Sequence, residues 1–112
     1  MRVRLDQIVI DARAPATLVR FWSALAGGIP VDRTRGWSHV EPPGLPRLSF
    51  QPVPEDRAGK NRLHLDLLVD DIAAAVAVAV ALGATVQGEP VTDDSGTFQV
   101  LSDPEGNEFC VR

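Results

Sequence analysis

Residues 63–69 read Leu-His-Leu-Asp-Leu-Leu-Val, an alternation that predicts a β-strand. One face of this strand is aliphatic and is expected to pack beneath a helix. The other face carries His64 and Asp66, which the parity of the strand turns away from the aliphatic layer. The aliphatic members are Leu63, Leu65, Leu67 and Val69. The stretch therefore predicts a sheet with one apolar side and one side that carries reactive groups.

The residues that follow predict a helix and further strands. Asp70 or Asp71 can cap a helix over residues 72–82, and Gly83 ends it. Strands are expected near residues 84–89, 97–102 and 108–112. We interpret Glu89 and the Asp93-Asp94 pair as parts of solvated loops, and residues 103–107 as a hairpin turn.

The first half of the chain repeats this order. Residues 5–11 predict a strand, residues 15–26 a helix, and residues 29–55 a small antiparallel meander. Placing Gln7 over His64 aligns strand with strand. With a one-residue gap, the glycines that end the two helices also coincide. We therefore predict an internal duplication in a single domain of residues 1–112, with a first module over about residues 1–57 and a second over about 58–112.

The composition limits the class of protein. The chain has 112 residues, 45% of them hydrophobic, and a net charge of −4, which is the wrong sign for a protein that neutralises phosphates. Its one cysteine, Cys110, fits a reducing compartment. No segment approaches the roughly 18 consecutive apolar residues of a membrane helix. We expect a cytoplasmic protein with no nucleic-acid or membrane partner.

Seven stretches, in their order and spacing, resemble the vicinal oxygen chelate superfamily of glyoxalases, bleomycin-resistance proteins and dioxygenases. The resemblance is closest to the small glyoxalase-like proteins of that group. It implies an α+β fold in which two βαβββ modules form a curved eight-stranded mixed sheet around a cavity, with both helices on the outer face. The stretches are residues 5–11, 21–22, 48–55, 61–66, 69–71, 82–86 and 103–110.

The same resemblance implies positions for a divalent metal. The ligand slots of catalytic members fall on Gln7, His64, Cys110, and Ser49 or Gln51. These offer one imidazole, weak neutral donors and a thiol, whereas a hard cation prefers carboxylate and water oxygens. The glutamate that also moves the substrate proton in glyoxalase chemistry is missing. We therefore expect no metal or other cofactor.

His64 and Asp66 are the candidate catalytic pair. His64 could protonate or orient a ligand, and it could equally be a hydrogen-bonded structural histidine. Asp66 could orient His64 or act as a base. The interpretation we favour for Asp66 is structural pairing with Arg47 or Arg62.

Other side chains are candidates for contacting a ligand. Trp37, interpreted as part of a meander strand, and Phe98 could stack on a flat molecule, and Arg47 could hold a carboxylate. Cys110 could be a soft metal ligand or simply a small apolar filler. Trp22 lies on the apolar stripe of the predicted helix and belongs to the core, and Phe50 and Phe109 belong to the core by the parity of their strands. The predicted ligand-binding set is Gln7, Trp37, Arg47, Gln51, His64, Phe98 and Cys110.

The leading hypothesis is a glyoxalase-like protein that binds a small organic molecule in the sheet cavity without a catalytic metal. The alternatives are a metal-dependent lyase, isomerase or dioxygenase, in which Gln7 and His64 would hold the ion, and a metal-free acid-base enzyme of His64 and Asp66. A homodimer is expected. The residues do not identify the ligand.

Overall fold

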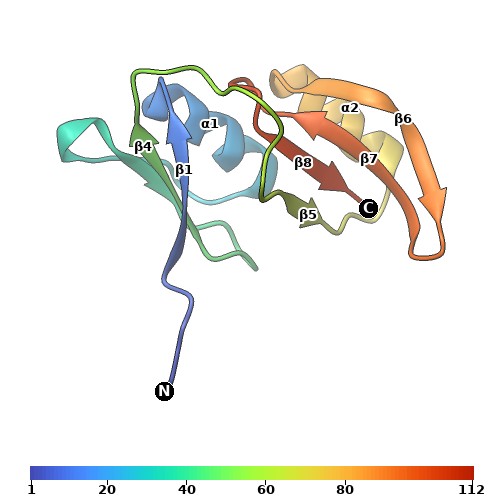
Figure 1. Ribbon diagram of the computed structural model, residues 1–112, viewed down its shortest axis with the longest axis horizontal. Helices are drawn as coiled ribbons and strands as arrows, with labels where there is room; N and C mark the ends of the chain where they lie inside the picture. Colours follow the sequence, from blue (N-terminus) through green and yellow to red (C-terminus); the bar gives the residue numbers. More distant parts are fainter. The chain divides into compact units, whose positions relative to one another are not determined.

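The computed structural model describes residues 1–112, which divide into two compact units, module one (residues 1–56) and module two (residues 57–112). Each module runs strand, helix and three further strands (Figure 1). The elements of module one are β1 (Gln7–Ala12), α1 (Pro15–Ala26), β2 (Val31–Asp32), the 3₁₀ turn η1 (Thr34–Gly36), β3 (Ser38–Val40) and β4 (Arg47–Pro52). Those of module two are β5 (Leu65–Leu67), α2 (Ile72–Leu82), β6 (Thr85–Asp93), β7 (Gly96–Ser102) and β8 (Glu108–Val111).

Module one is a four-stranded mixed sheet with the order β1-β4-β3-β2, in which β1 runs parallel to β4. Pro15 begins α1, where its missing N–H leaves no hydrogen bond unmade. The apolar face of α1 packs on β3 and β4. Trp22 and Phe50 are fully buried there, as the helix stripe predicts for Trp22 and strand parity predicts for Phe50. Burial of such large side chains is the main stabilising contribution to a small domain.

Module two repeats this topology with the order β5-β8-β7-β6, and β5 runs parallel to β8. Asp71 caps α2, since its side chain accepts a hydrogen bond from the backbone N–H of Ala74 at 3.0 Å. Gly83 ends the helix in the left-handed conformation, with φ of 116°, which a residue without Cβ adopts at low cost. The α+β fold of two βαβββ modules is thus confirmed, and its eight strands form two four-stranded sheets.

The two helices are buried to different extents. In α2 only Ala79 is fully buried, whereas α1 buries five residues. Val78, Val80 and Leu82 are among the exposed residues of α2, which has no polar side chain along its length. Neither α1 nor α2 is both long enough and apolar enough to cross a membrane.

The structure corrects several local predictions. Leu63 is 70% exposed rather than buried, because β5 begins only at Leu65. Glu89 and Asp93 belong to β6 instead of loops, since a register irregularity between Gln87 and Val91 accommodates the intervening residues. Bulges of this kind insert residues without ending a strand. Trp37 lies between η1 and β3, outside any strand.

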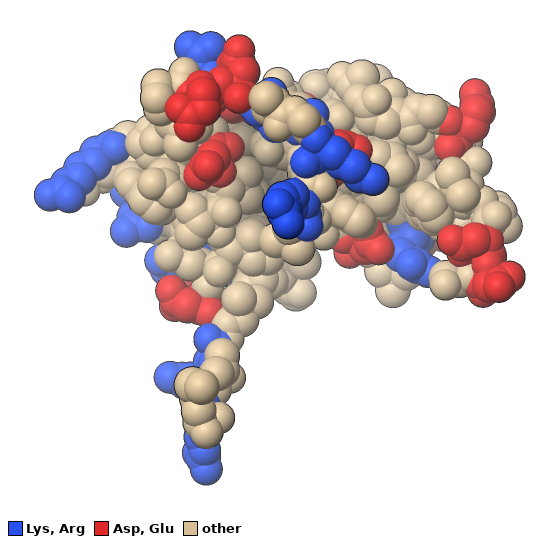
Figure 2. Space-filling model, in the orientation of Figure 1, with Lys and Arg blue, Asp and Glu red and all other residues tan.

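The chain before β1 forms an exposed arm. Residues 1–6 extend from the start of the strand, and Arg2 and Arg4 place positive charge along it (Figures 1 and 2). The predicted strand over residues 5–11 therefore begins two residues later, at Gln7. Elsewhere on the face in Figure 2, acidic and basic side chains are interspersed.

Candidate functional site

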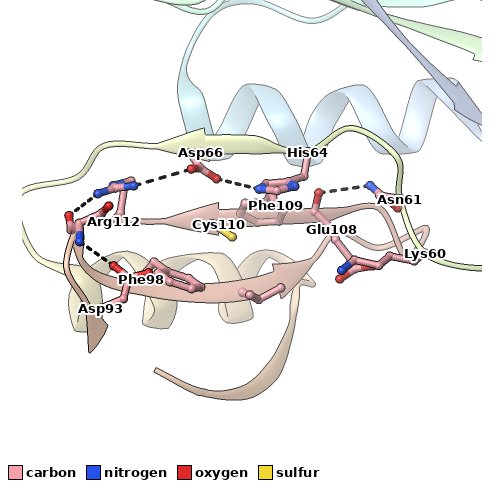
Figure 3. Close-up of a pocket in the computed structure, with 12 residues that line it drawn as sticks. Lys60, Asn61, His64, Asp66, Asp93, Phe98, Glu108, Phe109, Cys110 and Arg112 are labelled. Carbon is pink, nitrogen blue, oxygen red and sulfur yellow. Dashed lines mark hydrogen bonds and ion pairs between the residues drawn. The ribbon is translucent and has the colours of Figure 1, made fainter. Parts of the chain in front are cut away.

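Module two contains a cavity of about 350 Å³ that opens on the face of its sheet (Figure 3). This volume lies within the range of sites that hold small organic molecules. The lining residues are Lys60, Asn61, His64, Asp66, Asp93, Ser95, Phe98, Val100, Glu108, Phe109, Cys110 and Arg112. This fold therefore brings together three members of the predicted ligand-binding set, His64, Phe98 and Cys110, with Asp66 of the candidate catalytic pair.

Asp66 is the centre of the polar part of the cavity. Its Oδ1 lies 3.1 Å from Nε2 of His64, and its Oδ2 lies 3.9 Å from Nη1 of Arg112 (Figure 3). The Arg112 guanidinium is held in place because Nη2 donates to the backbone carbonyl of Ser95 at 2.6 Å. The predicted pairing of Asp66 with Arg47 or Arg62 is wrong. The partner instead comes from the last residue of the chain, which follows β8, the strand that pairs with β5.

His64 stands at the mouth of this cluster with its imidazole about half exposed. It precedes β5 by one residue, and the Asp66 carboxylate orients its ring. A hydrogen bond at Nε2 favours the tautomer with the proton on that nitrogen, which leaves Nδ1 as an acceptor. The imidazole lines the cavity and is exposed to solvent, so it does not point into the aliphatic interior.

Cys110 forms the floor of the cavity and is only 7% exposed. It is the register partner of Asp66 across the parallel β5–β8 pair. Burial, followed by the charge of Asp66 and a hydrogen bond to it, raises the pKa of the Cys110 thiol. The thiol is thus held in its protonated form, the unreactive state of cysteine.

A second charged pair lies at another part of the rim. Nη2 of Arg57 donates to the Glu108 carboxylate at 2.6 Å, and Nε of Arg57 donates to Asn61 at 3.0 Å. Glu108 therefore faces the cavity as a neutralised group. Lys60, the other cation of the lining besides Arg112, makes no ion pair. It is available to an anionic part of a bound molecule.

The apolar wall consists of Phe98 and Val100 from β7 together with Phe109 from β8. Phe109 is 1% exposed and belongs to the core, as its parity predicts. Phe98 is half-buried and offers a ring to the cavity. An aromatic face beside a few polar groups is typical of sites for flat organic molecules.

The positions of module one that correspond to the His64, Asp66 and Cys110 cluster hold uncharged side chains. In register, the β1–β4 pair Val9–Ser49 matches the β5–β8 pair Asp66–Cys110, with Gln7 at the position of His64. The Ser49 hydroxyl donates to Oε1 of Gln7 at 2.5 Å, so these two groups satisfy each other. Gln51 is half-buried on the same strand, at the position that Arg112 holds in module two.

The remaining predicted contact residues of module one have other partners or surroundings. Arg47 pairs with Glu41 at 3.0 Å, which is the ordinary surface role of such a residue. Trp37 is half-buried after η1. Nearby, Nδ1 of His39 is buried without a hydrogen-bond partner. Burial, with the positive charges of Arg47 and Arg33, lowers the pKa of His39.

The ligand slots implied by the family resemblance do not fit a hard divalent ion. Gln7 and Ser49 are neutral and bonded to each other, and Cys110 is a buried thiol. Only His64 offers a ready ligand. Ions such as Mg²⁺ and Mn²⁺ need several carboxylate or carbonyl oxygens, whereas these positions offer no carboxylate and only the amide oxygens of Gln7 and Gln51, of which that of Gln7 already accepts the Ser49 hydroxyl.

The lining residues that were not predicted from the sequence include Arg112, Lys60 and Asn61. Arg112 could have been found, since it lies two residues after Cys110 and so shares its side of β8. The loop residues Lys60 and Asn61 carry no comparable periodic signal.

Comparison with known proteins identifies the family to which this fold belongs. The sequence model of the glyoxalase-like domain family matches residues 7–112. No curated protein matches the chain. A glyoxalase/bleomycin resistance protein/dioxygenase family enzyme from Burkholderia phytofirmans is 21% identical, with a TM-score of 0.80 over 95% of this chain and 94% of that one.

Two further solved structures are similar. A glyoxalase-related enzyme from Fulvimarina pelagi is 17% identical with a TM-score of 0.75, over 96% of this chain and 86% of that one. A glyoxalase/bleomycin resistance protein from Albidiferax ferrireducens is 17% identical with a TM-score of 0.67, over 96% of each chain. At these identities the likeness concerns the fold, and the chemistry has to be argued from the site.

Proposed function

Because the chain belongs to the glyoxalase-like domain family, within the vicinal oxygen chelate superfamily, we propose that it binds a small organic molecule in the module-two cavity without a catalytic metal. The observation that carries this proposal is the His64–Asp66 contact of 3.1 Å inside a cavity of about 350 Å³. A fixed polar pair in a mostly apolar concavity gives a ligand both orientation and affinity.

The charged groups of the cavity indicate which chemical class of ligand it can bind. Asp66 and Glu108 are paired with arginines, while Lys60 has no ion-pair partner. A planar ring can stack on Phe98, and an anionic substituent can reach Lys60. The Nδ1 atom of His64 can accept a hydrogen bond from a hydroxyl group. These contacts describe a monocyclic aromatic acid with a ring hydroxyl.

We propose binding without a catalytic metal because of the ligand atoms that the family's metal positions offer in this chain. Of the family's ligand slots, only His64 is a strong donor, and none of them holds a glutamate that could move a substrate proton. Affinity must then come from hydrogen bonds and apolar contact.

The test is calorimetric titration of the chelator-treated protein with benzoate, 4-hydroxybenzoate and related monocyclic acids. We expect His64→Ala to weaken binding by up to about tenfold, because a hydrogen bond to the neutral imidazole contributes about 0.5–1.5 kcal/mol. Gln7→Ala is the matched control and should leave affinity unchanged. Binding by no compound of the panel, or only after a metal is added, would contradict the proposal.

A metal-free acid-base reaction is the second candidate function. The observation in its favour is again the His64–Asp66 pair, since a carboxylate that orients an imidazole is a common arrangement of a general base. For any compound of the panel that the protein converts, Asp66→Asn should lower kcat far more than it weakens binding. Equal loss of both would assign the pair to binding alone.

A further inference from the structure

Residues 1–6 form an exposed arm that continues β1 (Figure 1). Apolar and charged side chains alternate along the arm. Val3 and Leu5 are 80% and 68% exposed, and Arg2 and Arg4 form no ion pair. In an extended chain this alternation places the apolar side chains on one face and the arginines on the other. The arm therefore has the pattern of a strand, but it is not paired with any other strand.

Strand β6 has a free edge. It stands last in the sheet order β5-β8-β7-β6, so one side of its backbone pairs with β7 and the other side pairs with no strand. All nine of its residues are exposed. Gly88 and Pro90 interrupt the strand, and its regular pairing with β7 resumes over residues 91–93. A free and exposed edge of this kind can accept another strand through backbone hydrogen bonds.

The charge of β6 is opposite to that of the arm. Strand β6 and the turn after it carry Glu89, Asp93 and Asp94, and they contain no lysine or arginine. None of these three carboxylates forms an ion pair. Arg112 reaches this turn through the carbonyl of Ser95 and not through a carboxylate. Figure 2 shows the basic side chains of the arm and acidic side chains at the end of module two that carries β6. Opposite charges steer two surfaces together and fix their register.

The two faces at the edge of β6 match the two faces of the arm. Asp93 lines the cavity, so the cavity face presents a carboxylate at this edge (Figure 3). The opposite face is covered by α2, which packs on β6 and has only apolar side chains. Val86, whose register partner is the buried Leu101, is 40% exposed on that face. An arm laid along the edge with its arginines toward Asp93 therefore turns Val3 and Leu5 toward an apolar surface.

We propose that the arm of one copy of this chain adds as a strand to the free edge of β6 in a second copy, beside residues 91–93. Each copy has one arm and one β6 edge, so a dimer with two-fold symmetry satisfies both. Because Asp93 lines the cavity, the arm places an arginine of one copy at the cavity rim of the other. The contact needs no organic ligand, so it does not depend on the proposed function.

The first measurement is the mass of the full chain in solution, by size-exclusion chromatography with light scattering and without any ligand. We expect a dimer. Arg2→Glu with Arg4→Glu should raise the dimer dissociation constant at least about tenfold, because like charges then meet at β6. Glu89→Lys with Asp94→Lys should have the same effect from the other side of the contact. Both variants alter exposed side chains and leave the buried core unchanged.

The second measurement is the mass of a mixture of these two variants. In a mixed dimer each arm meets an edge of opposite charge, so two variants that do not self-associate should form a dimer with each other. Glu55→Lys and Arg62→Glu are the matched controls, since they reverse exposed charges outside the arm and β6 and should leave the dimer intact. A monomeric unaltered chain, a dimer that both variants leave intact, or a mixture that stays monomeric would overturn the inference.

Discussion

Module one and module two share their strand order and register but distribute their side chains differently. Module one fully buries Trp22 beneath its helix and keeps a neutral Gln7–Ser49 pair on the opposite face of its sheet. Module two buries little of its helix and carries charged and titratable groups on that face. Module one therefore has the more deeply buried helix, and module two has the reactive groups.

The largest loss of stability is expected from a substitution in α1, and the equivalent position of α2 provides the comparison. Trp22 and Val78 each stand five residues before the glycine that ends their helix, yet Trp22 is 1% exposed and Val78 is 52% exposed. Trp22→Ala should lower the free energy of unfolding by about 3–5 kcal/mol, because it leaves a cavity against the ring of Phe21.

The matched variant Val78→Ala should change the free energy of unfolding by no more than about 0.5 kcal/mol, since its side chain already faces solvent. Both losses can be measured by urea unfolding followed by far-ultraviolet circular dichroism, which does not rely on tryptophan fluorescence. Equal losses in the two variants would refute the difference in burial.

These helices also show what local sequence can predict. Pro15, Asp71 and the glycines after each helix are short-range signals, and both helices have the predicted bounds of 15–26 and 72–82. A capping side chain or a positive φ is decided within a few residues, so it can be recognised without knowledge of the rest of the chain.

The site was less predictable because it depends on long-range pairing. Asp66 meets Arg112 only because β5 lies beside β8, and sequence alone offered Arg47 and Arg62 as equally plausible partners. Strand β6 was cut short in prediction because Gly88 and Pro90 resemble a turn. The pairing with β7 resumes beyond them at Val91.

The turns between the last two strands of each module give the second prediction. Asp103 is buried, and its carboxylate accepts hydrogen bonds from the backbone N–H groups of Glu105 and Asn107, both at 2.9 Å. The corresponding turn of module one has the same backbone bond, from Leu45 to the carbonyl of Pro42, but no such side chain.

Asp103→Ala should therefore cost about 1–3 kcal/mol of unfolding free energy, because buried donors lose their acceptor. The measurement is thermal unfolding by calorimetry, with the exposed Asp94→Ala as the control that should remain near the unaltered chain. A loss in the control as large as that in Asp103→Ala would mean that acidic charge, and not the turn, is responsible.

Acid should act on module one through His39. Burial and the nearby arginines lower the pKa of His39 below its ordinary value of 6.5, so the unfolded chain takes up a proton there more readily than the folded one. The stability contributed by neutral His39 is present above about pH 6.5 and is lost as the pH falls below it. The unpartnered Nδ1 of His39 adds to the cost of protonation in the folded state, because a proton on that atom would have no hydrogen-bond acceptor.

His39→Gln should flatten the dependence of the melting temperature on pH just below 6.5. His64→Gln removes the other imidazole of the chain, so a loss just below pH 6.5, above the range in which carboxylates titrate, that persists in that variant belongs to His39. A slope that disappears in His64→Gln and survives in His39→Gln would place the acid sensitivity in module two.

The smallest effect concerns the rim of the cavity. The Arg57–Glu108 pair is about 70% buried at both side chains, and its contact is 2.6 Å. The Arg20–Asp32 pair of module one is half exposed. Glu108→Gln should lower the unfolding free energy by about 0.5–1 kcal/mol, because partial burial limits screening of the pair by water. Asp32→Asn should have a weaker effect that salt removes more completely. Unfolding of both variants is measured at low and at high salt. A larger and less salt-dependent loss in Glu108→Gln would show that the ion pair of module two contributes more to stability than that of module one. This is expected because Arg57 holds both Asn61 and Glu108 at the cavity.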